Sequence, residues 1–430
     1  MKPDAIEAAS HLAGKVFRDI KVSLRDADDT ARGFFWDAQS IGTLSEDGIR
    51  TYVRLLIDLR DTENLKDRVS LGFYMHEFNL LFANRETIVS DTTDWNQIIK
   101  ELLVRAEQSI KEWNVYLPIF GVANSSVEPL RIGNVELVRI TDEAFDDIED
   151  IVDKPDYAGE EKSARKRRRM TIGAFSRAGS PQPTRLIGQT CLQVTVKCES
   201  GMAIYDARSR TEPVLHALTY FSSFNETTSA IPRIGFDVMA SNETRVAVAV
   251  APQRNEGHWL YDHPANQELL TLDTDFLETS RQSGFVTLNE ILGKKQNNSF
   301  ENVILTALKW FHQAVNSPQE ENQFVNLVMV LESFLNPDGG ERVSDAVSEG
   351  TALLLKKEYQ ARLLLKREMK DFYKVRSKIA HGSKPTLTEL SQINDLRMIA
   401  RDFLKEMIFQ ATDWRSLEDV RKHVELLKLS

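Results

Sequence analysis

Residues 362–382 read Arg362-Leu-Leu-Leu-Lys-Arg-Glu-Met-Lys-Asp-Phe-Tyr-Lys-Val-Arg376-Ser-Lys-Ile-Ala-His381-Gly382. The stretch contains no proline, and four of its apolar residues recur at the three- and four-residue spacing of a buried helical stripe: Leu365, Met369, Phe372 and Ile379. Gly382 stands where helices commonly end, and Pro385 prevents the helix from continuing. The sequence therefore predicts one amphipathic helix that ends at His381 and Gly382.

A charged residue interrupts the apolar stripe of this helix. At about 100° per residue, Arg376 falls in the middle of the stripe. A buried guanidinium is costly unless it pairs with an acidic group or faces a charged ligand or a partner. Residues 356–384 carry ten basic and three acidic residues, so a polyanion should prefer this helix to the rest of the chain. The opposite arc carries most of this charge: Lys366, Arg367, Lys370, Lys374, Lys378 and His381.

The whole chain has an ordinary globular composition, with 430 residues, 42% hydrophobic and 27% charged. This length predicts two or three domains. The net charge of −10 argues against a general nucleic-acid coat. Cys191 and Cys198 share a strand-like run, and we expect buried thiols in a reducing compartment. The first residues lack a signal-peptide pattern, and no apolar run approaches membrane-spanning length, so we expect a cytoplasmic protein without a membrane partner.

Patterning predicts an α+β N-terminal region followed by an all-α helical-bundle C-terminal domain. Residues 1–115 are predicted to be mainly helical, with Asp94 as the N-cap of a helix whose apolar side runs from Trp95 to Trp113. Residues 116–292 are predicted to be α+β, with a hairpin at 130–140 and strands near 192–198 and 244–250. The polar segment 293–299 is the predicted linker. Residues 300–430 are predicted to contain helices near 302–315, 320–335, 342–357, 362–382, 387–411 and 413–428.

Two charge blocks of opposite sign lie next to each other in the middle region. Residues 142–161 contain ten acidic residues, and residues 162–169 contain six basic ones. The basic block could contact RNA phosphates or act as a nuclear import signal. Such runs are more often solvated, and the two blocks could neutralise each other in a surface loop. Neither interpretation decides the function.

Three segments of the C-terminal region support a family resemblance. They are Leu331-Glu332-Ser-Phe-Leu, Val347-Ser-Glu-Gly350-Thr-Ala-Leu-Leu-Leu, and Phe372-Tyr-Lys-Val-Arg376-Ser-Lys-Ile-Ala-His381-Gly. Their order and spacing across roughly 300–410 resemble the HEPN fold, particularly its ApeA-like branch. One departure is Gly350, where many ApeA-like members carry an arginine.

The residues Arg376 and His381 fall within the Arg-x4-to-6-His signature of HEPN ribonucleases. The spacing alone is weak, because Arg210 and His216 also satisfy it in an unrelated segment. The surrounding residues, namely Tyr-x-x-Arg-Ser before the motif and His-Gly at its end, give the match its weight.

The resemblance implies metal-independent cleavage of RNA, in which the ribose 2′-OH attacks the adjacent phosphate and leaves a 2′,3′-cyclic phosphate and a 5′-OH. His381 would transfer protons, because histidine titrates near neutral pH. Arg376 would hold the phosphate and stabilise the charge of the transition state. Glu332 would orient Arg376 or His381, and Ser377 would hydrogen-bond the imidazole.

The remaining expectations concern RNA and metals. Four lysines are expected to follow the RNA backbone: Lys366, Lys370, Lys374 and Lys378. No set of Asp, Glu and His has metal-ligand spacing, so we expect no catalytic metal and no cofactor.

Arg376 and His381 would lie about 140° apart around a regular helix. Either the last turn before Gly382 loosens, or two chains share the site. HEPN ribonucleases typically dimerise with their Arg/His pairs facing each other. An arginine within an apolar stripe also fits a dimer seam beside a phosphate site, so a homodimer through the C-terminal domain is predicted.

Simpler roles remain open for each of these residues. Arg376 could pair with a core carboxylate such as Glu332, His381 could only cap a helix, and the lysines could form a solvated face.

Two functions stay open at the level of the whole chain. One is an endoribonuclease acting on cellular or viral RNA, such as tRNA or mRNA, as a toxin-like effector of antiviral defence by abortive infection, a setting that only the resemblance implies. The other is a catalytically silent HEPN module that binds RNA, a nucleotide or a partner, with the N-terminal region sensing an unknown trigger. Residues 116–285 carry no P-loop, dinucleotide-binding motif or nucleophile elbow that would indicate a third activity.

Overall fold

The computed structural model describes residues 3–19, 32–33, 43–44, 46–62, 65–83, 94–123, 129–152, 187–224, 231–236, 245–251, 256–262, 269–335 and 343–429. The chain forms two compact units. The first contains Met1–Val115 and Val194–Arg210, and the second contains Tyr116–Gln193 and Thr211–Ser430. The sequence-based division at 1–115, 116–292 and 300–430 remains a prediction.

The described part of the first unit consists mainly of helices around an apolar core. They are α1 (Pro3–Asp19), α2 (Glu46–Arg60), α3 (Leu71–Ala83) and α4 (Trp95–Ser109), together with the antiparallel pair of β1 (Arg32–Gly33) and β2 (Thr43–Leu44). The buried side chains Tyr52, Leu55 and Leu59 follow the helical spacing of α2 and pack in this core. The core is therefore built from one face of each helix.

Asp94 caps α4 as predicted, because its Oδ1 accepts the backbone N–H of Gln97 at 3.2 Å. The predicted length of this helix is wrong. It ends at Ser109, since Ile110 is extended and the chain then enters strand β3 (Lys111–Pro118). Trp113 lies in that strand, where its indole N–H donates to the carbonyl of Cys198 at 2.9 Å.

A small sheet occupies the N-terminal half of the chain. Its order is β3, β7 (Thr190–Cys198), β6 (Val135–Arg139) and β5 (Leu130–Ile132), and β5, β6 and β7 pair antiparallel. Gly133 turns the predicted β5–β6 hairpin with a φ of +60°, which favours glycine. Cys191 and Cys198 are free and buried, and burial raises the pKa of the Cys191 thiol to about 12.

Further elements lie between the strands of this sheet and after them in the chain. The helices are α5 (Asp142–Val152) and α8 (Ser200–Ser222), β4 (Val122–Ala123) pairs with β10 (Leu270–Thr271) in parallel, and β8 (Arg245–Ala251) pairs with β9 (Glu256–Asp262) antiparallel. The basic block 162–169 lies outside the described residues, as does the acidic block beyond α5.

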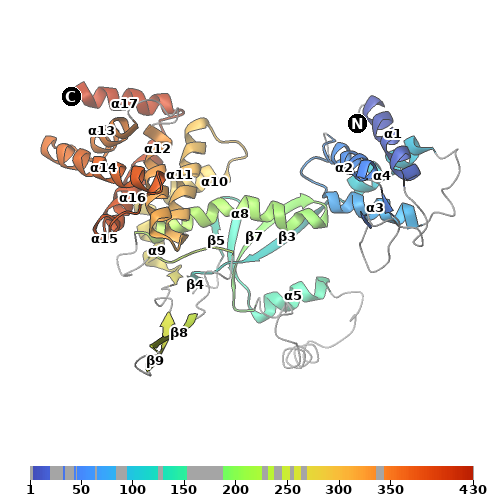
Figure 1. Ribbon diagram of the computed structural model, residues 1–430, viewed down its shortest axis with the longest axis horizontal. Coiled ribbons are helices and arrows are strands. Elements are labelled where there is room, and N and C mark those ends of the chain that lie inside the picture. The colour runs from blue at the N-terminus through green and yellow to red at the C-terminus, as the bar shows by residue number, and fades with distance from the viewer. Residues whose placement is uncertain are drawn as a thin grey trace. The chain divides into compact units, whose positions relative to one another are not determined.

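The C-terminal region is helical, as predicted (Figure 1). Its helices are α9 (Thr274–Gln282), α10 (Phe285–Gly293), α11 (Ser299–Asn316), α12 (Glu320–Leu335), α13 (Val343–Leu355), α14 (Tyr359–Ala380), α15 (Leu387–Leu390), α16 (Ile393–Gln410) and α17 (Leu417–Leu429). The single helix predicted at 387–411 is instead the two helices α15 and α16. Aromatic rings join the core, since Phe334 packs edge-on against Phe300 and Phe403 at 5.8 and 5.6 Å between centroids.

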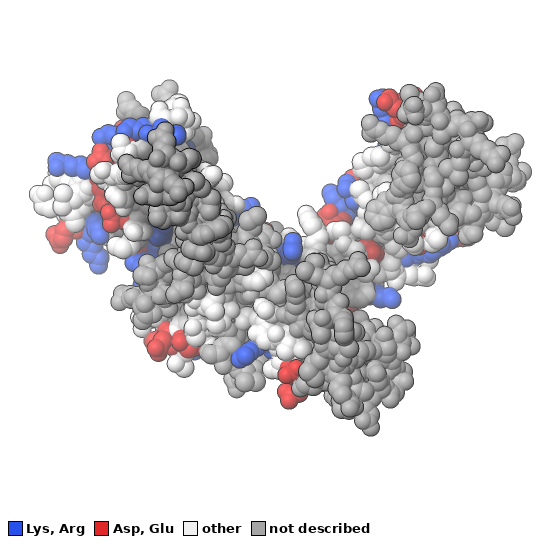
Figure 2. All heavy atoms as spheres, turned by 60° about the horizontal axis from the view of Figure 1, so that its bottom comes forward, with Lys and Arg blue, Asp and Glu red and all other residues white. Residues whose placement is uncertain are grey.

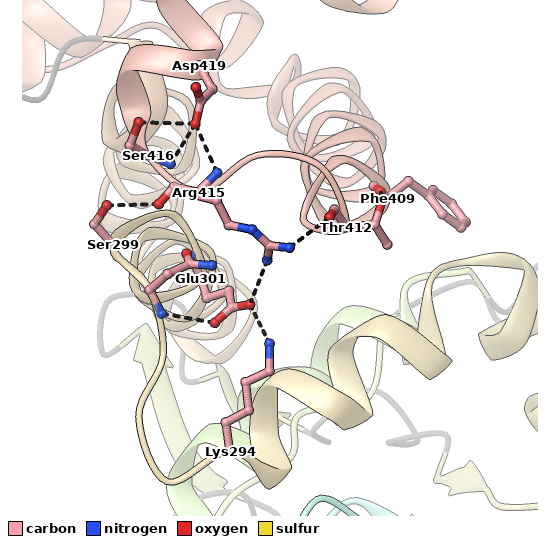
Figure 3. A network of polar contacts seen from close by, with 9 residues as sticks. Lys294, Ser299, Glu301, Phe409, Thr412, Arg415, Ser416 and Asp419 are labelled. Atoms are coloured by element: carbon pink, nitrogen blue, oxygen red, sulfur yellow. Dashed lines mark hydrogen bonds and ion pairs between the residues drawn. The ribbon is translucent and has the colours of Figure 1, made fainter.

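A polar network fixes the start of α11, directly after the predicted linker (Figure 3). Glu301, with 2% of its surface exposed, forms a capping box with Asn298. Its carboxylate also binds the Lys294 ammonium at 2.6 Å, and Arg415 approaches it at 4.0 Å. The predicted linker is therefore tied to α11 and to the connection between α16 and α17.

Candidate functional site

Helix α14 carries the motif residues and buries its apolar stripe within the second unit. Leu365, Met369 and Phe372 are buried, and Ile379 is half-buried. The ring of Phe372 packs edge-on against Phe324 of α12, with centroids 5.9 Å apart. The stripe therefore faces helices of its own chain, which removes the apolar argument for a dimer seam.

Helix α14 ends at Ala380, and His381 is its C-cap. The backbone N–H of His381 donates to the carbonyl of Ser377 at 3.1 Å, as in an uninterrupted α-helix. The backbone departs from helical values at His381, with φ −92° and ψ 12°, and reverses at Gly382, whose φ is +75° and whose N–H donates to the carbonyl of Ile379 at 3.0 Å. The last turn therefore keeps its α-helical hydrogen bond to His381 and loosens only at the cap, and on the spacing of a regular helix Arg376 and His381 remain about 140° apart.

Arg376 is held by a carboxylate of the neighbouring helix α12. Its Nη2 lies 3.4 Å from Oε2 of Glu332, and the hydroxyl of Tyr373 donates to Oε1 of the same carboxylate at 2.8 Å. The guanidinium side chain is 33% exposed, whereas that of Glu332 is 12% exposed. Burial and the adjacent Glu332 carboxylate raise the pKa of Tyr373, so its hydroxyl remains a donor. The alternative that Arg376 pairs with Glu332 is confirmed.

The Nε of Arg376 is buried and makes no hydrogen bond to any described residue. A buried donor without a partner costs about 1–3 kcal/mol. Glu332 thus orients the guanidinium through Nη2, and several of the N–H donors of Arg376 have no acceptor among the described residues.

His381 and Ser377 are both exposed on the last turn of α14. They are four residues apart, so they share one face of the helix. Among the described residues, neither the imidazole nor the Ser377 hydroxyl has a side-chain partner. The structure therefore gives His381 access to solvent and places Glu332 against Arg376.

Each of the four lysines expected to follow RNA is paired with a carboxylate. The ammonium–carboxylate distance is 2.7 Å in three pairs, and the fourth pair is also in contact: Lys366–Glu349, Lys370–Asp345, Lys374–Asp371 and Lys378–Glu389. Blue and red side chains accordingly lie side by side over the C-terminal helices in Figure 2. Such half-exposed ion pairs contribute roughly 0–1 kcal/mol each, so a phosphate could replace the carboxylate at little cost.

Sequence reasoning missed two residues that the structure adds to this region. Tyr373 lies three residues before Arg376, and its spacing could have suggested a shared partner. Glu389 closes a capping box with Thr386, a pattern that the sequence Thr386-Leu-Thr-Glu389 does show.

Gly350, where the resemblance would lead one to expect arginine, lies in the close contact of α13 with α12. A Cβ added there would stand 2.7 Å from Cδ2 of Leu335. A larger residue at this position would have to displace the Leu335 side chain.

Among the described residues, no group of three or more His, Cys, Asp and Glu side chains is placed to hold a metal ion. Within the same part of the chain, no helix combines the length and apolar character that crossing a membrane requires. Comparison with protein-family models, curated proteins and solved structures gives no match to this chain.

Proposed function

We propose that this chain is a HEPN-type endoribonuclease that cleaves cellular or viral RNA without a metal ion, in the cytoplasm, as an effector of antiviral defence. The three segments of the resemblance lie on α12, α13 and α14, which pack against one another. One observation carries the proposal. Arg376, near the C-terminal end of α14, is partly exposed and is oriented by Glu332 of α12, and an exposed His381 caps the same end of α14. The defence setting rests on the resemblance alone.

The chemistry follows from the properties of these two side chains. Arg376 would hold a phosphate of the RNA and stabilise the negative charge that builds up during attack. The 2′-oxygen forms a bond to phosphorus, the bond from phosphorus to the 5′-oxygen breaks, and the 2′-OH loses a proton while the 5′-oxygen gains one. His381 would move one of these protons. Glu332 and Tyr373 would keep the guanidinium in place.

A homodimer is part of the proposal, because the positions of Arg376 and His381 around α14 favour a site shared between two chains. On the spacing of a regular helix, Arg376 and His381 of one chain lie about 140° apart around α14. Two copies related by a two-fold axis could bring Arg376 of one chain toward His381 of the other. Such a site would be composite, and each dimer would contain two of them.

The test is incubation of purified protein with total cellular RNA in excess EDTA. We expect cleavage that leaves 2′,3′-cyclic phosphate ends and falls at least about 100-fold in His381→Ala and in Arg376→Ala. His76→Ala, which changes an exposed histidine of α3, is the matched control and should cleave as the wild type does. A strict need for Mg²⁺ with 3′-OH products would refute the proposed chemistry.

A catalytically silent binding module is the second candidate. The observation that favours it is that Arg376 and all four lysines are already paired with carboxylates. Wild-type protein that retains labelled RNA in a binding assay and yields no cleaved ends would support this candidate over the first.

A further inference from the structure

The carboxylate of Glu389 gathers groups from both sides of the turn that follows His381. Its Oε1 binds the ammonium of Lys378 on α14. Its Oε2 accepts the backbone N–H of Thr386 at 2.8 Å and the Thr386 hydroxyl at 3.1 Å. The hydroxyl in turn accepts the N–H of Glu389 at 3.3 Å, which completes the capping box of α15.

These contacts bracket the histidine in the chain. Lys378 precedes His381 by three residues, and Thr386 follows it by five. The backbone bonds from Gly382 to Ile379 and from Ser383 to Lys378 close the first half of this segment, at 3.0 and 2.9 Å. Glu389 closes the second half. With both ends fixed, the segment that carries the imidazole has few conformations left.

The Glu389 carboxylate keeps its charge over the working range of pH. The hydrogen bond from Lys378, the Thr386 backbone N–H and the Thr386 hydroxyl lower the pKa of Glu389 to about 2, although burial opposes them. The contact should therefore hold at any pH at which histidine transfers protons.

We propose that Lys378 and Glu389 are positioning residues for His381: together they fix the turn between α14 and α15 and thereby the direction of the imidazole. This inference rests on the proposed function. It assigns Lys378 a different role from that of the other three lysines. The partners of Lys366 and Lys370 lie on α13, and Lys374 pairs within α14, so none of these pairs spans the turn.

The test uses Glu389→Gln and Lys378→Met in the full chain, with Asp371→Asn as the matched control. Asp371→Asn also frees a lysine of α14 from its carboxylate, but it leaves the turn fastened. Three quantities are measured: amide hydrogen exchange over residues 379–390, the single-turnover cleavage rate with total cellular RNA, and affinity for fluorescein-labelled RNA of random sequence. Circular dichroism verifies the fold of each variant.

Both variants should behave alike if the pair positions His381. We expect exchange in the turn to rise about tenfold or more and cleavage to fall roughly 10- to 100-fold, because small displacements of a reacting group have effects of this size. RNA affinity of Glu389→Gln should not fall. The control should keep wild-type exchange and cleavage.

The opposite pattern would overturn the inference. If Lys378 only contacts RNA, Lys378→Met weakens binding, Glu389→Gln strengthens it, and exchange in the turn stays unchanged. Faster exchange with wild-type cleavage would also refute a positioning role. If the wild type cleaves no RNA, the proposed function fails, and the exchange measurement alone decides whether the pair fixes the turn.

Discussion

Two histidines lie side by side inside the second unit, and their removal should alter its response to acid. The ring centroids of His216 on α8 and His312 on α11 are 4.7 Å apart, and His216 is only 6% exposed. The Nδ1 of His312 lies 2.8 Å from the Thr219 hydroxyl and 3.1 Å from the amide nitrogen of Asn316. These neighbours suit neutral rings better than charged ones.

The size of the effect follows from the protonation of both rings. Burial first, and then the nearby His312 and Lys309, lower the pKa of His216 to about 3, and burial lowers the pKa of His312 to about 4. An unfolded histidine titrates near pH 6.5. The two neutral rings therefore contribute their full stabilisation of the folded state above about pH 6.5, and this contribution is lost as the pH falls toward the pKa values of the folded protein. At about pH 5 the loss is about 2 kcal/mol for each ring, or about 4 kcal/mol for the pair.

The assay is urea unfolding at about pH 7 and about pH 5, followed by circular dichroism. The double variant His216→Phe/His312→Gln removes both titrating rings, and His76→Gln is the exposed-histidine control. Between the two pH values, the wild type and the control should lose about 4 kcal/mol more unfolding free energy than the double variant. Equal losses in all three proteins would refute the reasoning.

Three further outcomes are expected. Lys294→Met leaves the buried Glu301 without its closest cation and should lower the unfolding free energy by about 1–3 kcal/mol. The neighbouring Lys295→Met should change the unfolding free energy little, and equal stability of the two variants would contradict the role of the network in Figure 3. Gly382→Ala should cost about 1 kcal/mol, because φ is +75° there, and Gly382→Asn should cost less; urea unfolding compares them, and an unchanged Gly382→Ala would argue against the helix end described above. Reversing the charges of Lys366, Lys370 and Lys374 together should weaken RNA binding. The slope of RNA affinity against salt concentration should fall by roughly one counterion for each lost phosphate contact, and an unchanged slope would show that these lysines do not contact RNA.

Much of the helical pattern could be predicted because it depends on local spacing. The bounds of α12 agree at both ends with the predicted 320–335, and α14 differs by a few residues from the predicted 362–382. The hairpin at 130–140 also agrees, since its glycine turn is a local signal. The strand position of Trp113 escaped prediction because helical spacing continued past the true end of α4.

The environment of the candidate site was less accessible, since it depends on segments far apart in the chain. The sequence offered Glu332 only as one of several partners for Arg376, because the two residues lie 44 positions apart and only the packing of α12 against α14 brings them together. Lys366 likewise pairs with Glu349, which is 17 residues away. The periodicity of α14 predicted which residues are buried, whereas the tertiary packing determined that helices of the same chain bury them.

A subunit-mixing experiment tests the central proposal, a composite Arg/His ribonuclease site, most directly. Arg376→Ala and His381→Ala are assayed separately and after mixing under conditions that exchange subunits. After subunit exchange, half of the dimers should contain one chain of each variant. Each mixed dimer retains one intact Arg/His site of two, so the mixture should regain about a quarter of wild-type cleavage. Each variant alone should be inactive. Wild-type cleavage by either variant alone, or no recovery in a mixture whose subunits have exchanged, would contradict the account.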